Sequence, residues 1–345
     1  MLRVAMASSK RHEQLVRITS LRRFVGTLAR GGDREATAEA LVELAHAEAE
    51  GLTEAALQHA RQALTLLAQQ EPSEATTRAL LQVATVCLGA EDAETATTAA
   101  DLAIERSALV AESVRNELAA AGSLLAGIAW SVRQDPERAR EKLHVARDRF
   151  VEAGLPTAAA LALTQLALID AEQGRWDAAE VCFRFAREFY RASGDMAATA
   201  EVGAVAARMF AAEGVRWRTQ WLRTAVTDAD HAGDKLMAAE LLLDLSDVIA
   251  SDGNADSAGT TAAEALPFLR QAFAQALLAR DEQQLANVIE VLVRGLVRGR
   301  LEQPGWQLLD KFRDELTRWG FHALGDTASK ARDLLGDGEP DQSFE

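Results

Sequence analysis

The sequence predicts an all-α protein, namely a right-handed α-solenoid of about seven antiparallel helical hairpins with a capping helix at each end. Apolar residues make up 48% of the 345 residues but aromatic residues only 5%, which indicates a core of closely packed helices with small side chains. A similar pattern also recurs about every 40 residues, the length of one helical hairpin. The residues that close the successive copies are Ala63, Ala103, Ala146, Ala186, Ala225, Ala265 and Phe312.

The first element expected is a basic N-terminal capping helix, residues 1–34. Residues 1–30 carry seven Lys or Arg and one acidic residue, whereas the whole chain has a formal charge of −15. Arg22 interrupts the apolar stripe of this helix, so packing on the first hairpin is favoured over lying on an anionic membrane. Docking on the acidic body of a neighbouring copy is a further alternative. The stripe comprises Leu15, Ile18, Leu21, Val25 and Leu28.

The clearest hairpin spans residues 158–195. Its first helix has apolar residues at helical spacing, Gly174 interrupts the pattern, and the second helix resumes it. Gly194 is expected to end the second helix in a left-handed conformation, and Asp195 to cap the next helix.

This hairpin and the one before it share a pattern of small and large apolar residues. Its members are Leu166, Ala167, Gly174, Ala179, Phe183 and Ala186, and before them Ala126, Gly127, Trp130, Ala139, Leu143 and Ala146. In this pattern both hairpins resemble the tetratricopeptide repeat family. The resemblance covers residues 35–320 and implies two antiparallel helices in each unit. Because the period here exceeds the family's usual one, the chain is similar to long-helix variants, with helices of about 17 residues.

The last third departs from this pattern. Pro267 should kink the helix expected over residues 257–280, since proline cannot donate a backbone hydrogen bond. Asp281 and Gln284 read as a capping box for the next helix, and a seventh hairpin closes around Phe312. A C-terminal capping helix is expected within residues 321–336, near 327–335, followed by a disordered acidic tail at 337–345.

Composition restricts the functional classes. The acidic body repels phosphate backbones, so no nucleic acid is expected, and apolar or basic protein partners are favoured. Cys87 and Cys182 lie far apart, which fits a reducing compartment. Neither a signal peptide nor a membrane-spanning run is evident, so the protein is expected in the cytoplasm; an organellar transit peptide is the alternative for the basic N-terminus.

The first helix of each hairpin is expected to line a concave binding face of mixed apolar and polar character. The alternative for its apolar members is simple packing between helices. Family members that grip a peptide carboxylate use Lys, Arg and Asn here, so this chain is expected to prefer an apolar or amphipathic helix. The projected residues are Leu81, Thr85, Leu124, Ile128, Leu161, Thr164, Gln165, Leu168, Glu172, Arg208, Leu243 and Asp247.

No catalytic residue, metal or cofactor is predicted. The sequence has neither a phosphate-binding glycine loop nor a nucleophile elbow. Asp228, Asp230, His231 and Asp234 are explained better by a helix end and a helix start than by a metal site. Asp252, Asn254 and Asp256 begin like a calcium loop, but Ser257 and Ala263 replace the required glycine and glutamate.

The sequence therefore predicts a non-catalytic scaffold or adaptor that binds a partner peptide or helix along its concave face. The alternative is a regulatory module that senses a small molecule or assembles with copies of itself. For that alternative the candidate pocket lies around Trp130, Phe183, Phe185 and Phe210.

Overall fold

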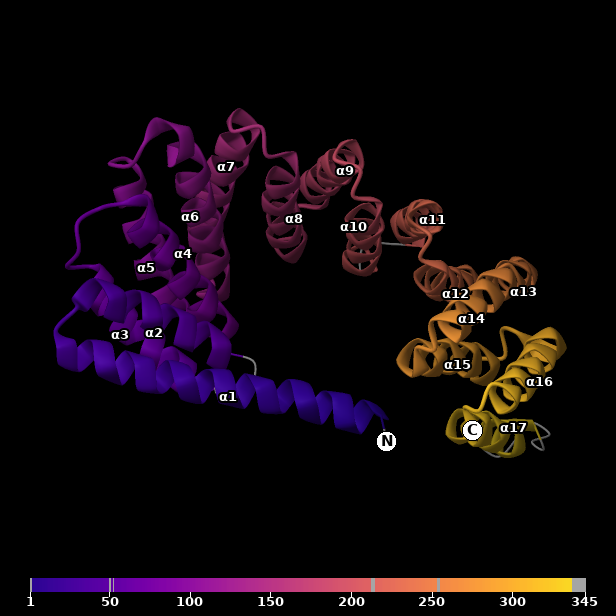
Figure 1. Ribbon diagram of the computed structural model, residues 1–345. Coiled ribbons are helices and arrows are strands. Elements are labelled where there is room, and N and C mark those ends of the chain that lie inside the picture. The colour runs from indigo at the N-terminus through magenta and orange to yellow at the C-terminus, as the bar shows by residue number, and fades with distance from the viewer. Residues whose placement is uncertain (1, 50, 52, 212–214, 253–254, 337–345) are drawn as a thin grey trace. The chain divides into compact units, whose positions relative to one another are not determined.

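The computed structural model describes residues 2–49, 51, 53–211, 215–252 and 255–336, and this part of the chain is helical, without a strand. It divides into two compact units, Met1–Gln173 and Gly174–Glu345. The helices of both units are labelled in Figure 1. The all-α helical-repeat fold class is confirmed. The boundary between the units lies in the turn of the predicted fourth hairpin, so a single continuous array over residues 35–320 stays a prediction.

Unit 1 consists of a long N-terminal helix, three hairpins and one further helix. Adjacent first helices contact one another, since α2 touches α4, α4 touches α6 and α6 touches α8. Stacking of this kind places the first helices side by side on one face of the unit. The helices are α1 (Leu2–Gly31), α2 (Arg34–Glu48), α3 (Thr53–Leu67), α4 (Glu74–Gly89), α5 (Ala93–Ser107), α6 (Glu112–Val132), α7 (Pro136–Glu152) and α8 (Pro156–Glu172).

Unit 2 continues the alternation of antiparallel helices to the C-terminal helix. In it α12 contacts α13, α14 and α15, and α15 contacts α16 and α17. The helices are α9 (Trp176–Ala192), α10 (Met196–Met209), α11 (Val215–Ala232), α12 (Lys235–Ser251), α13 (Ala255–Ala263), α14 (Ala265–Ala279), α15 (Glu282–Val297), α16 (Glu302–Arg318) and α17 (His322–Gly336).

The residues that carry the repeat pattern are core residues. All six alanines that close the predicted units are fully buried, and Phe312 is 2% exposed. Close approach of the paired helices explains the small side chains. A Cβ atom added to Gly203 on α10 would lie 2.9 Å from the Cβ of Ala225 on α11, and one added to Gly127 on α6 would lie 2.6 Å from Cγ of Leu143 on α7. The repeat predicted from the sequence is confirmed.

Two of the helix boundaries in unit 2 share one sequence pattern, a glycine followed by an aspartate. Gly194 has φ of +76° and ends α9, and the Asp195 side chain then accepts a hydrogen bond from the backbone N–H of Ala198. Gly233 and Asp234 do the same between α11 and α12. An aspartate begins each next helix because its carboxylate satisfies a backbone donor that has no partner within the helix. Both predicted pairs are confirmed.

The helix that was expected to kink at Pro267 is instead divided into two helices. The helical run breaks at Glu264 into α13 and α14, three residues before the proline. Proline removes the donor that would otherwise bond the carbonyl of residue 263. At the next boundary the Asp281 side chain accepts from the N–H groups of Gln283 and Gln284, which confirms the predicted start of α15.

The terminal helices pack on their neighbours. Ile18 of α1 is buried against Leu44 and Ala47 of α2. Arg22, which interrupts the apolar stripe, reaches the fully buried carboxylate of Glu48 at 2.7 Å. The His59 imidazole binds the other oxygen of Glu48, also at 2.7 Å.

At the other end of the chain, α17 begins five residues earlier than the expected helix 327–335 and buries Ala328. The predicted tail, 337–345, lies outside the described residues. Among the helices that the structure describes, none is long and apolar enough to cross a membrane.

Candidate partner-binding face

The first helices of unit 1 expose a regular row of side chains. On each helix the accessible positions follow the spacing i, i+4, i+7 and i+11, which keeps them on one side of an α-helix. Because α4, α6 and α8 lie side by side, their rows form one continuous face. The face comprises Arg78, Gln82 and Thr85 of α4, Ala121, Leu125, Ile128 and Val132 of α6, and Leu161, Gln165, Leu168 and Glu172 of α8.

Nine of the twelve projected binding residues are accessible. In unit 1, Thr85, Leu161 and Glu172 are exposed, and Leu81, Ile128, Gln165 and Leu168 are half-buried. In unit 2, Arg208 is exposed and Asp247 is half-buried. The structure brings six of these unit 1 residues together on the face of α4, α6 and α8, whereas Leu81 packs against the core of the unit. Arg208 and Asp247 lie on helices of the other unit.

The projection was wrong for Leu124, Thr164 and Leu243, because all three are buried. Consecutive helical residues point about 100° apart. Leu124 is therefore turned into the core, while its neighbour Leu125 reaches the face. The hydroxyl of Thr164 donates to the carbonyl of Ala160 in its own helix, at 2.9 Å. A partner cannot touch these residues without disrupting the packing.

The middle of the unit 1 face is apolar. Val132 is 50% exposed and Leu161 40% exposed, and the two lie on adjacent helices. Sequence reasoning missed Leu125 and Val132, although both continue the helical spacing of Ile128. We call these five residues the apolar strip: Leu125, Ile128, Val132, Leu161 and Leu168.

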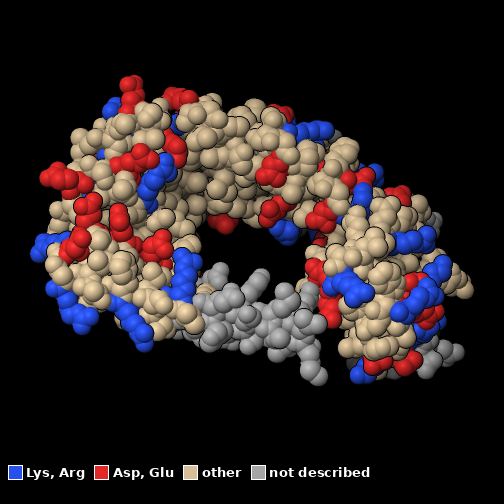
Figure 2. All heavy atoms as spheres, in the orientation of Figure 1, with Lys and Arg blue, Asp and Glu red and all other residues tan. Residues whose placement is uncertain are grey.

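The arginine side chains near the strip already have partners. The Arg78 guanidinium binds Glu74 at 2.9 Å and Glu117 at 3.2 Å, and these carboxylates raise its pKa above the usual value. Beyond the end of α6, the Arg133 and Arg138 guanidinium groups lie over the Trp130 ring at 4.2 and 4.6 Å. Figure 2 shows acidic and basic side chains interspersed over the surface, with uncharged areas between them. A partner on the face would therefore meet these arginines with contacts already made.

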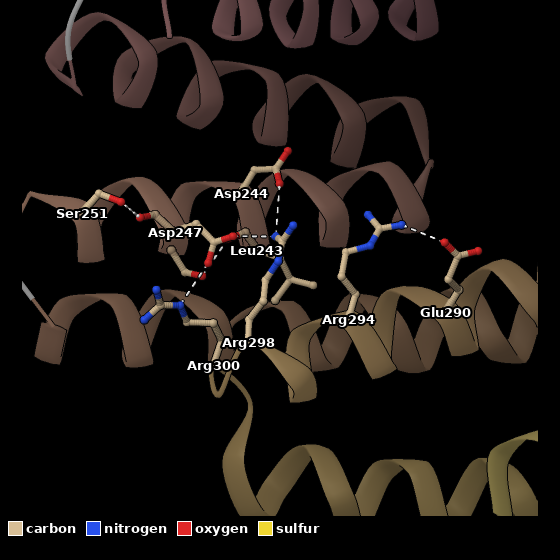
Figure 3. Close-up of polar contacts among 9 residues, drawn as sticks. Leu243, Asp244, Asp247, Ser251, Glu290, Arg294, Arg298 and Arg300 are labelled. Carbon is tan, nitrogen blue, oxygen red and sulfur yellow. Dashed lines mark hydrogen bonds and ion pairs between the residues drawn. The ribbon is translucent and has the colours of Figure 1, made fainter. Parts of the chain in front are cut away.

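In unit 2, an ion-pair cluster joins α12 to the end of α15 (Figure 3). The Asp247 carboxylate accepts from Arg298 at 2.5 Å and from Arg300 at 3.0 Å. Arg298 also lies 3.9 Å from Asp244. Asp247, a projected binding residue, thus holds the turn between α15 and α16 in place.

Two carboxyl groups on the same side of α12 have altered pKa values. Burial raises the pKa of Glu240, and the nearby Arg294 guanidinium offsets only part of this effect. Burial also raises the pKa of Asp244, against the opposing influence of Arg298. Both side chains are half-buried, so the ionised forms lack full solvation.

The residues considered for metal binding have structural partners. Asp228 binds Arg187, Asp230 pairs with Lys235, and Asp234 caps α12. Across the part of the chain that the structure describes, no group of three or more His, Cys, Asp or Glu is arranged to hold a metal ion. Asn254 of the calcium-like segment lies outside the described residues.

Phe183 and Phe210, two of the aromatic residues proposed as a ligand pocket, are packed core residues. Phe183 and Phe210 are fully buried, with ring centroids 6.3 Å apart, and Phe210 stacks on Trp217 at 5.6 Å. Phe185, in contrast, is 45% exposed. In unit 1, Trp130 is covered by two arginines as described above. Phe183 and Phe210 therefore fill the core of unit 2.

Comparison with known proteins gives likeness in structure alone. No family model and no curated protein matches the chain. The apo form of RapI superposes with a TM-score of 0.51 at 20% identity, over 77% of this chain and 95% of RapI. A STAND signal-transduction ATPase with a tetratricopeptide repeat sensor, from Pyrococcus horikoshii, superposes with a TM-score of 0.50 at 15% identity. That match covers 91% of this chain but 48% of the ATPase. The fold is that of tetratricopeptide-like helical repeats, as predicted.

Proposed function

We propose that this protein is a non-catalytic scaffold or adaptor that binds a peptide or helix of a partner protein on the first-helix face of unit 1. The observation that carries the proposal is the apolar strip, where Val132 of α6 and Leu161 of α8 leave large aliphatic surfaces accessible on adjacent helices. Exposed apolar patches in a row are typical of helix-in-groove recognition.

Partner binding on the strip would be driven by burial of apolar surface, without any covalent reaction. Covering about 100 Å² of apolar surface contributes about 2.5 kcal/mol, which is offset in part by the ordering of the partner. The acidic surface of the protein favours a partner whose polar residues are neutral or basic. The presence of just two cysteines, Cys87 and Cys182, fits action in a reducing compartment such as the cytoplasm.

The test replaces two strip residues with acid, Ile128→Asp and Leu161→Asp together. Leu124 is unsuitable, since a buried charge would unfold the protein. The matched control is Leu109→Asp, which places the same charge on a 69% exposed leucine in the turn between α5 and α6. Capture from lysate of the source organism should lose its partners with the strip variant and keep them with the control. Identical partner sets for both variants would contradict the proposal.

A second candidate function, sensing of a small apolar molecule, has its own observation. Unit 1 contains a cavity of about 500 Å³ between α1, α2 and α3, a size typical of ligand pockets. A ligand that binds only the folded protein must raise its melting temperature. A metabolite screen by thermal shift on the wild type and on a Thr65→Trp variant, which fills the cavity, tests this candidate. The cavity is lined by Val25, Ala29, Gly32, Asp33, Arg34, Thr37, Leu41, Gln62, Thr65 and Leu66.

A further inference from the structure

A second recess in unit 1 lies between α1, α2 and α4, apart from the apolar strip. Its volume is about 470 Å³. One wall comes from α1, where Phe24 is 55% exposed although it is a large aromatic residue. We call this recess the acidic groove. It is lined by Leu21, Phe24, Ala36, Glu39, Ala40, Val42, Glu43, Ala75, Arg78, Ala79 and Gln82.

The floor of the groove is built from small side chains. Ala36 and Ala40 are one turn apart on α2, and Ala75 and Ala79 are one turn apart on α4. Small residues at this spacing let a third helix approach closely, because no long side chain holds it away. The groove is thus open to the large side chains of an incoming helix.

The charges at the groove are predominantly acidic. Glu39 has no cationic partner in the described part of the chain, and Glu43 pairs only with Arg17, at 3.3 Å, in an exposed ion pair. Arg78, the basic residue of the lining, is already bound by Glu74 and Glu117. An entering cation would therefore meet an unpaired carboxylate and a weakly held one.

We infer that the acidic groove binds a basic amphipathic helix of a partner protein. The apolar side of that helix would pack on Phe24, Leu21 and the alanine floor, and its Lys or Arg residues would pair with Glu39 and Glu43. The groove shares Arg78 and Gln82 with the first-helix face but contains none of the five strip residues, and the inference holds whether or not the strip binds a partner. Electrostatic pairing at an exposed rim also makes the affinity fall as salt concentration rises.

The test titrates the full-length protein with a synthetic helix of about 18 residues made of Leu and Lys, with all Leu on one side. The matched probe replaces each Lys with Glu. Two protein variants act on different properties of the groove. Glu39→Lys with Glu43→Lys reverses its charge, and Ala75→Trp fills it without changing charge. The control is Glu94→Lys with Glu105→Lys, an equal charge change at exposed positions of α5.

Both groove variants should weaken binding of the Leu and Lys helix at least tenfold, whereas the α5 control should bind like the wild type. Circular dichroism of each variant shows that helicity is retained. Unchanged affinity of both groove variants, or equal binding of the Leu and Glu helix, would overturn the inference. The inference would also be overturned if Leu161→Asp lost binding of the probe while the groove variants kept it, because the probe would then lie on the apolar strip.

Discussion

The Arg187 guanidinium on α9 binds both carboxylate oxygens of Asp228 on α11, at 2.5 and 2.9 Å. Asp228 is fully buried, and the Arg187 side chain is 19% exposed. Lys142 of α7 and Asp101 of α5 form a more exposed bridge at 2.7 Å, again 41 residues apart. Ion pairs thus link helices of successive repeats, in addition to the apolar packing between them.

Removal of one partner from the Arg187–Asp228 pair should be costly. Arg187→Met leaves an unpaired carboxylate in the core of unit 2, which we expect to lower the free energy of unfolding by about 3 kcal/mol. Urea denaturation followed by tryptophan fluorescence measures this change, because Trp217 and Trp221 lie in the same unit. The double variant Arg187→Met with Asp228→Leu should recover part of the loss. A double variant less stable than Arg187→Met would show that the pair is not the cause.

Gly203 should not tolerate even a methyl group. In Gly203→Ala the new Cβ would lie 2.9 Å from Cβ and 3.2 Å from Cα of Ala225, atoms that cannot rotate away. Overpacking of this kind typically costs about 1–3 kcal/mol. Gly26→Ala on α1 is the control, since nothing lies within 4 Å of its added Cβ and alanine favours a helix. We expect a lower melting temperature for the first variant and an equal or higher one for the second. The opposite order would show that α10 and α11 are not closely packed.

Glu240 gives a prediction about pH. In the folded protein, burial raises the pKa of the Glu240 carboxyl group above its usual value of 4.5. The ionised form of Glu240 therefore opposes folding at neutral pH. Below the usual pKa the group is protonated in both the folded and the unfolded state, so the penalty disappears. Glu240→Gln should therefore raise the denaturation midpoint at pH 7, and the difference from wild type should vanish below about pH 4.5. A difference that grows as pH falls would contradict the assigned direction of the shift.

The two cysteines should differ in reactivity. Cys87 is buried, and burial raises the pKa of its thiol to about 12, so almost no thiolate forms at neutral pH. Cys182 is only half-buried. Iodoacetamide followed by mass spectrometry should label Cys182 first in the native protein and Cys87 only after denaturation. Equal labelling rates would mean that α4 opens readily.

The repeat was predictable because the same residue types recur at corresponding positions of successive hairpins. Ala186 and Ala225 close their patterns because second helices admit only small residues there, and glycine followed by aspartate, as at Gly194 and Asp195, marks a helix end and the next start. Signals of this kind lie within one hairpin. They need no knowledge of more distant contacts.

The binding face was only partly predictable. Leu124 and Leu125 have the same side chain, so only their orientation distinguishes a buried residue from one on the face. Arg187 and Asp228 are also 41 residues apart, and no local pattern pairs them. The groove beside Phe24 depends on where α1 lies, which its apolar stripe does not specify.

Site-specific photo-crosslinking tests the central claim most directly, that a partner segment lies on the first-helix face of unit 1. Benzoylphenylalanine would replace Leu161 in one protein and Leu109 in another, and both would be irradiated in lysate of the source organism. The account predicts discrete cross-linked partners from position 161, competed away by unlabelled wild-type protein, and none from position 109. Cross-links from position 109 alone, or the same products from both positions, would contradict it.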